Sequence, residues 1–113
     1  RSRRFYALHI FEAPVVIVVL THRLYTALGE EPALGQGMQS VGAAIENLLL
    51  AATALGYGGC WAALPLEVAS REIEALLNIE KPWYAVAMVS IGVPRGKPRR
   101  VPRKSIEEIV TFR

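Results

Sequence analysis

The chain has 113 residues, of which 52% are hydrophobic and 20% are charged, and its formal net charge is +3. A disordered or low-complexity polypeptide would have fewer apolar residues and a more one-sided charge, so a folded protein is predicted. No apolar run reaches the roughly 18 to 20 residues that span a bilayer. A lone cysteine, Cys60, cannot form an internal disulfide. We therefore expect a cytoplasmic protein outside the membrane, with a single domain over residues 1–113.

Positive charge is concentrated near the C-terminus. One segment without acidic residues carries six basic side chains: Arg95, Lys97, Arg99, Arg100, Arg103 and Lys104. Taking these six from the net charge of +3 leaves −3 for the rest of the chain. The segment fits either a solvated loop or an anion site, because Arg and Lys bind phosphate through charge-assisted hydrogen bonds. Nucleic-acid binding is disfavoured, since the segment is proline-rich and has no aromatic residues to stack on bases.

In the first half of the chain, residues 1–11 fit the end of a helix. The β-branched run at residues 15–20 does not alternate with polar residues and is typical of a central strand covered on both faces. Residues 21–37 predict an irregular connection. Residues 39–55 predict a helix buried nearly all round, ended by Gly56. Glu46 and Asn47 interrupt its apolar surface, so they lie either at one wet edge or against a second subunit.

In the second half, residues 58–64 predict a short strand and Pro65 the first turn of a helix closed by Asn78. Residues 83–92 predict another strand. Ser105 and Glu108 match a capping box that opens a short helix through residue 110. The order of elements predicts an α/β or α+β fold. Three hydrophobic strands with so few helices leave the sheet under-covered, so an absent part of the chain or a second subunit is expected to complete it.

No side-chain motif predicts catalysis or metal binding. Cys60 lies in a predicted buried strand, where packing is favoured over a nucleophilic role. His9 and His22 lack metal-ligand spacing, and the chain contains no Asp, which removes support for a paired-carboxylate site. The glycines at residues 56–59 lie between a helix and a strand, the reverse of a dinucleotide-binding loop.

Five stretches in register resemble the C-terminal half to two-thirds of the FMN-dependent nitroreductase family. They are Ala13-Pro14-Val15-Val16-Ile17-Val18-Val19, residues 42–52, residues 54–61 (Ala-Leu-Gly-Tyr-Gly-Gly-Cys-Trp), Ile91-Gly92-Val93-Pro94 and residues 103–110. Gly59, Val93 and Ser105 depart from residues frequent in the family. The family's N-terminal part has no counterpart here, so residues 1–113 are expected to be a single partial domain.

The resemblance implies a mixed sheet flanked by helices and completed by dimerisation, with FMN at the interface of a homodimer. Residues Trp61, Ala62, Ala63 and Leu64 would run along the flavin ring, with backbone N–H groups near Ala63 and Leu64 facing its N5 and O4 edge. Arg103 would hold the FMN phosphate, with Arg100 as a second contact. No catalytic side chain and no metal are implied, because the flavin performs the chemistry.

The predicted function is an FMN-dependent NAD(P)H oxidoreductase, or nitroreductase, that passes electrons to a nitroaromatic or quinone-like acceptor. The alternative is a non-catalytic dimeric module or truncated relative that binds an anionic ligand or partner through its basic C-terminal loop. The alternative follows from the missing N-terminal part, which in the family also grips FMN.

Overall fold

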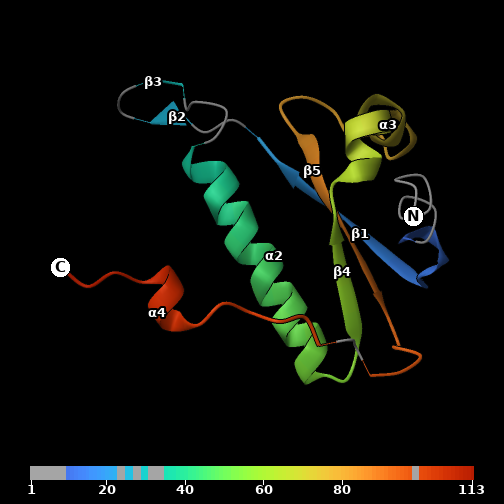
Figure 1. Cartoon of the computed structure of the whole chain (residues 1–113). Coiled ribbons are helices and arrows are strands. Elements are labelled where there is room, and N and C mark those ends of the chain that lie inside the picture. Colours follow the sequence, from blue (N-terminus) through green and yellow to red (C-terminus); the bar gives the residue numbers. More distant parts are fainter. Residues whose placement is uncertain (1–9, 23–24, 27–28, 31–34, 98–99) are drawn as a thin grey trace.

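A computed structural model describes residues 10–22, 25–26, 29–30, 35–97 and 100–113. Its main sheet has three strands in the order β1 (Val15–Thr21), β5 (Tyr84–Gly92) and β4 (Gly58–Ala62) (Figure 1). A small hairpin joins β2 (Tyr25–Thr26) to β3 (Gly29–Glu30). The helical elements are η1 (Ile10–Glu12), α2 (Gln36–Ala54), α3 (Leu64–Leu76) and α4 (Ile106–Ile109). The predicted helix at residues 1–11 falls almost wholly outside the described residues.

The α+β fold class is confirmed, with helices on a small sheet. Strand β5 is central and pairs antiparallel with both neighbours, so the described part of the sheet contains no parallel pair. Val89 of β5 is fully buried, as expected of a central strand. The expectation that residues 15–20 form a central strand is wrong for the described sheet, because β1 is one of its edges.

A bulge in β5 decides which side chains face which layer. Val19 pairs with Ala87 and Leu20 pairs with Ala85, so Val86 has no counterpart on β1. Side chains alternate along a strand, and one extra residue reverses that alternation. Ala85 therefore shares a face with residue 88, although an odd number of positions separates them.

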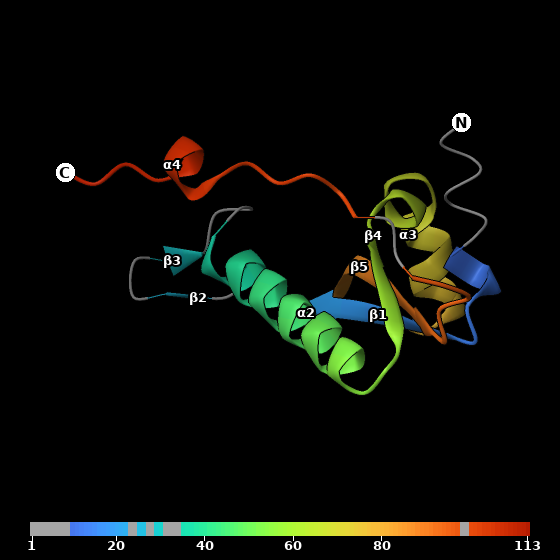
Figure 2. The ribbon, with the colours of Figure 1, turned by 60° about the horizontal axis from the view of Figure 1, so that its bottom comes forward.

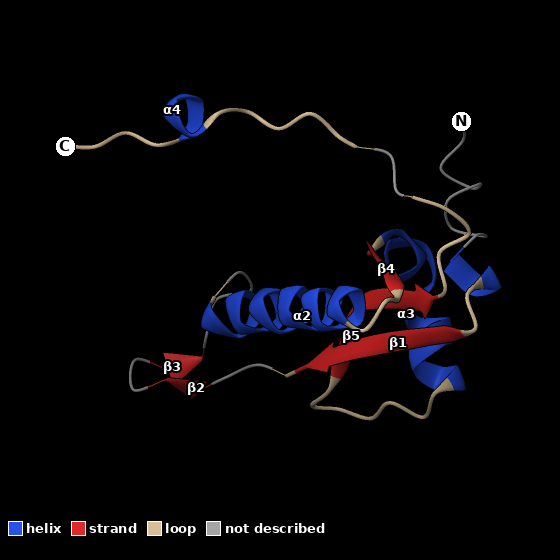
Figure 3. Ribbon diagram, turned by 90° about the horizontal axis from the view of Figure 1, so that it is seen from below, coloured by secondary structure: helices blue, strands red, loops and turns tan. Residues whose placement is uncertain are grey.

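Helix α2 covers one face of the sheet, and α3 with η1 covers the other (Figures 1 and 3). On the α2 face, Ile45 packs against Ala87 and Val89. The second cluster, on the opposite face, is formed by Ile10, Leu66, Ala85 and Met88. The core thus consists of two small clusters separated by β5.

The start of helix α2 differs from the prediction, whereas its end agrees with the prediction. The helix begins at Gln36, three residues before the predicted start. It ends as expected, because Gly56 adopts a left-handed φ of 84° and the N–H of Tyr57 donates to the carbonyl of Ala52 at 2.9 Å. The expectation of burial nearly all round is wrong. Only Gly37, Ile45 and Ala52 are buried, because the described residues leave the outer face of the helix uncovered.

Helix α3 follows β4 directly and has a kink. Pro65 lies in its first turn, as predicted, and Ala69 has non-helical angles (φ −146°, ψ 35°). Asn78 closes the helix in a left-handed conformation with φ 53°. The N–H of Ile79 then donates to the carbonyl of Glu74 at 2.9 Å, which satisfies one of the last helical acceptors.

Residues 100–113, here called the C-terminal arm, are exposed along their whole length. Figure 2 shows the arm extended and standing away from the sheet, with α4 as its one helical turn. The predicted capping box is confirmed: the N–H of Ser105 donates to Oε2 of Glu108 at 2.8 Å. Among the described residues, no helix combines the length and hydrophobicity required to cross a membrane.

Candidate functional site

The turn between β4 and α3 contains the four residues predicted to run along a flavin. Strand β4 ends at Ala62, which pairs with Met88 in the central strand. Ala63 is the N-cap residue of α3, and Leu64 is its first helical residue. Because the turn is attached to the sheet before it and to α3 after it, the scaffold fixes the course of its backbone.

Two backbone N–H groups of this turn have no turn or cap acceptor among the described residues. The carbonyl of Ala63 accepts bonds from the N–H groups of Leu66 and Glu67, at 2.9 and 3.2 Å. Between described residues, no turn or cap hydrogen bond is donated by the N–H of Ala63 or Leu64, and no side chain caps the helix. The first N–H groups of a helix have no intrahelical acceptor. The turn therefore offers two neighbouring N–H donors, which suit the acceptor atoms at a flavin's N5 and O4 edge.

The indole of Trp61 lies on the α2 side of the sheet. A Cβ added to Gly42 of α2 would be 3.9 Å from Cη2 of Trp61, so the ring lies against the helix at this glycine. The Trp61 side chain is still 46% exposed. Its exposed part adds an apolar surface next to the turn.

Gly59, two residues before Trp61 on β4, also faces α2, and it has no space for a larger side chain. A Cβ on Gly59 would lie 2.6 Å from Cδ2 of Leu49 and 3.0 Å from Cδ1 of Ile91. Any larger residue would have to displace these side chains. This packing explains why glycine stands at a position where related sequences are expected to carry Thr.

The two predicted phosphate-binding residues lie on the C-terminal arm. Arg100 and Arg103 line a pocket of about 520 Å³ together with Val101 and Pro102. Both arginines are exposed. Neither this pocket nor the one described next is lined by both the arm and the β4–α3 turn, so these two pockets of the described residues do not unite the two halves of the predicted site.

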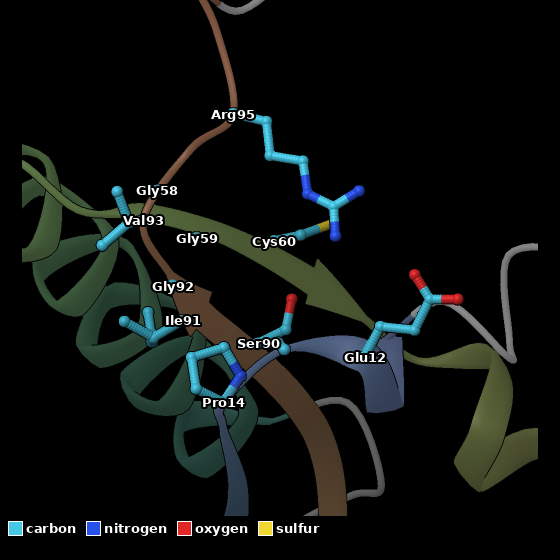
Figure 4. A pocket seen from close by; sticks show the side chains of 11 residues that line it. Glu12, Pro14, Gly58, Gly59, Cys60, Ser90, Ile91, Gly92, Val93 and Arg95 are labelled. Atoms are coloured by element: carbon cyan, nitrogen blue, oxygen red, sulfur yellow. The ribbon is translucent and has the colours of Figure 1, made fainter.

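A second pocket, of about 660 Å³, lies over the start of β4 and the end of β5 (Figure 4). Its floor is made of small residues, among them Gly58, Cys60 and Ser90. Arg95 projects over it on one side and Glu12 stands on the other. Sequence reasoning missed this pocket because its glycines were interpreted only as turn residues and Arg95 only as part of the basic segment.

The expectation that Cys60 is buried is wrong. The residue is exposed, and its Sγ contacts the carbonyl oxygen of Trp61 at 3.7 Å. The described residues leave the side chain of Cys60 on β4 uncovered. Within the described ranges, no three His, Cys, Asp or Glu side chains are grouped so that they could hold a metal ion.

Comparison with known proteins bears on this arrangement. The model of the nitroreductase family matches residues 1–93, most of the chain. The chain belongs to the nitroreductase family. No curated protein shows a significant sequence match to it.

Solved structures resemble this nitroreductase-family chain over most of its length. A BluB-like flavoprotein from Clostridium difficile 630 is 34% identical, with a TM-score of 0.76 over 93% of this chain and 56% of that one. A nitroreductase family protein from Clostridium novyi NT is 25% identical, with a TM-score of 0.67 over 84% of this chain and 52% of that one. An NADPH:FMN oxidoreductase from Vibrio harveyi, in complex with NAD+, is 25% identical, with a TM-score of 0.60 over 67% and 33%.

The chain therefore spans little more than half the length of the Clostridium difficile protein and about half that of the Clostridium novyi protein. The family match extends through β5 and ends before the C-terminal arm. Trp61, Ala62, Ala63 and Leu64 lie inside the matched region, whereas Arg100 and Arg103 lie beyond it. Their roles at a flavin site stay predictions.

Proposed function

We propose that this chain belongs to an FMN-dependent oxidoreductase that passes electrons from NAD(P)H to a nitroaromatic or quinone-like acceptor. The observation that carries the proposal is the pair of N–H groups at the β4–α3 turn that have no turn or cap acceptor among the described residues, within a chain of the nitroreductase family. Two structural relatives, 34% and 25% identical, are a BluB-like flavoprotein and an NADPH:FMN oxidoreductase, which supports the proposal.

The residues of this chain suit FMN in two separate ways. The N–H groups of Ala63 and Leu64 would donate to the N5 and O4 edge of the flavin, where donors favour the reduced, anionic form. The guanidinium of Arg103, and Arg100 beside it, would pair with the phosphate through charge-assisted hydrogen bonds. FMN, when bound, supplies the transfer of a hydride from the nicotinamide and of electrons to the acceptor. The protein's part is to orient the ring, exclude water and stabilise charge.

A homodimer is part of the proposal, because the outer face of α2 needs a cover. This face presents mainly small or apolar side chains, with Leu50 59% exposed, and it includes Ala43, Ala54 and Asn47. Small residues allow two helices to approach closely, and a second copy would bury this stripe. It would also give Asn47 a polar partner. Sedimentation equilibrium should give a dimer mass, and a monomer at all concentrations would contradict this part of the proposal.

The visible spectrum of the purified protein tests the function most simply. We expect bound or added FMN to give a flavin absorption band in the protein fraction, and NADH or NADPH to bleach it without oxygen. Adding a nitroaromatic or a quinone should then restore the band. A protein that neither retains FMN nor oxidises either nicotinamide would contradict the proposal and favour a non-catalytic module.

A further inference from the structure

One polar contact joins the second half of α3 to the central strand. Oε1 of Glu74 accepts a hydrogen bond from the N–H of Ala85 at 2.9 Å. Ala85 is 9% exposed, and β4 ends opposite Met88, so Ala85 has no partner residue on β4. The carboxylate of Glu74 thus satisfies a buried backbone donor, and such charge-assisted bonds are stronger than neutral ones.

The contact falls at the one irregular point of the strand. Val86 is the bulged residue of β5, and Ala85 is its neighbour. The bulge turns Ala85 toward α3, onto the same face as Met88. Glu74 therefore holds β5 at the bulge that decides which of its side chains meet α3.

The same stretch of β5 supports the β4–α3 turn. Ala62, just before the turn, pairs with Met88. Leu66, just after it, packs in one cluster with Ala85 and Met88. The two donors of the turn, at residues 63 and 64, are thus held between two attachments to residues 85–88 of β5.

The kink at Ala69 divides α3 into two parts with separate anchors. Leu66 anchors the first part in the core, whereas the second part is held by Ile73, which packs against the same cluster, and by the bond from Glu74 to Ala85. Without the Glu74 bond, only the non-directional packing of Ile73 would hold the second part of α3 on the sheet, and a shift of this part would pass through the kink to the turn.

We propose that Glu74 is a positioning residue for the β4–α3 turn: by holding α3 on β5, it fixes how the N–H groups of Ala63 and Leu64 meet a ligand. The inference rests on the proposed function, because that ligand is taken to be the N5 and O4 edge of FMN. Glu74 itself does not touch the flavin in this account.

The experiment compares wild type with Glu74→Ala, Glu74→Gln and, as a control, Glu72→Ala, which removes an exposed carboxylate from the same helix. For each protein we would measure the FMN dissociation constant, the flavin absorption band, the flavin midpoint potential and the urea midpoint of unfolding. Glu74→Ala should weaken FMN binding roughly threefold to tenfold, the range of indirect coupling through a scaffold, and should shift the band and the potential. Glu74→Gln should stay close to wild type because its amide oxygen can accept the same bond, and Glu72→Ala should change nothing.

A purely structural role would lower the urea midpoint of Glu74→Ala and leave the dissociation constant, the band and the potential of its folded fraction unchanged. That result would overturn the inference while the proposed function stands. If Glu74→Ala does not fold, Glu74→Asp takes its place, since it keeps the charge but withdraws the acceptor by one methylene group. Glu74→Asp with wild-type flavin properties would equally overturn the inference. If the wild type binds no FMN, the proposed function fails and this inference fails with it.

Discussion

The β4–α3 turn and the C-terminal arm carry the two halves of the proposed flavin site, and they are built in opposite ways. The turn is attached to the core on both sides, through Ala62 in the sheet and Leu66 in a buried cluster. The arm has no buried residue, and Phe112 is 89% exposed. One half of the site is therefore positioned by the fold of this chain, whereas the other half depends on contacts outside it.

Because of this difference, substitutions in the turn and in the arm should affect different properties of the protein, namely its stability and its binding of a ligand. Side chains that hold the turn also hold the core, so their loss should unfold the protein. Side chains of the arm make no core contact, so their loss should leave the fold intact and act only on a ligand or partner. Substitutions in the two regions can test whether the separation holds.

The largest expected effect is on stability, at the inner face of α2. Ile45 is 1% exposed and packs on β5, so Ile45→Ala should lower the free energy of unfolding by about 2–5 kcal/mol. On the arm, Ile109 is 65% exposed, and Ile109→Ala should change the free energy of unfolding by less than about 0.5 kcal/mol in a monomeric sample. Urea denaturation followed by circular dichroism measures both. Similar losses in the two variants would show that the arm is packed in solution.

The next effect is on binding, at the arm. Arg103→Ala should raise the FMN dissociation constant about tenfold to hundredfold, the equivalent of one hydrogen bond to a charged group. Its urea midpoint should not change. The matched control is Lys97→Ala, which removes another exposed positive charge from the basic segment. Fluorescence titration of FMN distinguishes them, and equal weakening in both variants would mean that only net charge attracts the ligand.

The smallest effect is on pH dependence, in α4. A backbone hydrogen bond at Glu107, and then the hydroxyl of Ser105, lower the pKa of the Glu107 carboxyl below its ordinary value of 4.5. The ionised form therefore stabilises the folded turn fully above pH 4.5, and this stabilisation is lost as the pH falls through the lowered pKa. We expect α4 to fray in acid before the core unfolds.

Titration of the Glu107 side-chain carbon by NMR measures this pKa directly. In Ser105→Ala the pKa should move back toward its ordinary value, because the hydroxyl no longer stabilises the carboxylate. A Glu107 that titrates at its ordinary value in the wild type would contradict the account of the turn.

Local chemistry explains what could be predicted from the sequence. Gly56, Pro65 and Asn78 act through their own backbone, and Ser105 acts through a local capping box, so the C-terminal end of α2, the ends of α3 and the cap of α4 follow from the residues themselves. The β-branched run at residues 15–20 was correctly predicted as a strand. Its place at the edge of the described sheet could not be predicted, because strand order depends on contacts between distant segments.

The candidate site shows the same limit. The turn at residues 61–64 was found by resemblance, and nothing in its sequence reveals that two of its N–H groups have no turn or cap acceptor in the described part of the chain. The contact between Glu74 and Ala85 could not be foreseen either, since it depends on a bulge one residue away. Cys60 was misplaced because a hydrophobic strand was assumed to be covered, and the cover over that part of β4 is not supplied by the described residues.

The most direct test of the central claim is an FMN titration of the isotope-labelled protein followed by NMR. The account predicts saturable shifts of the Ala63 and Leu64 amide signals and, over the same concentration range, of the Arg103 side-chain signal. Such a result would place both halves of the site on one ligand. Shifts at Arg103 alone, or at none of the three, would contradict a flavin held at the β4–α3 turn.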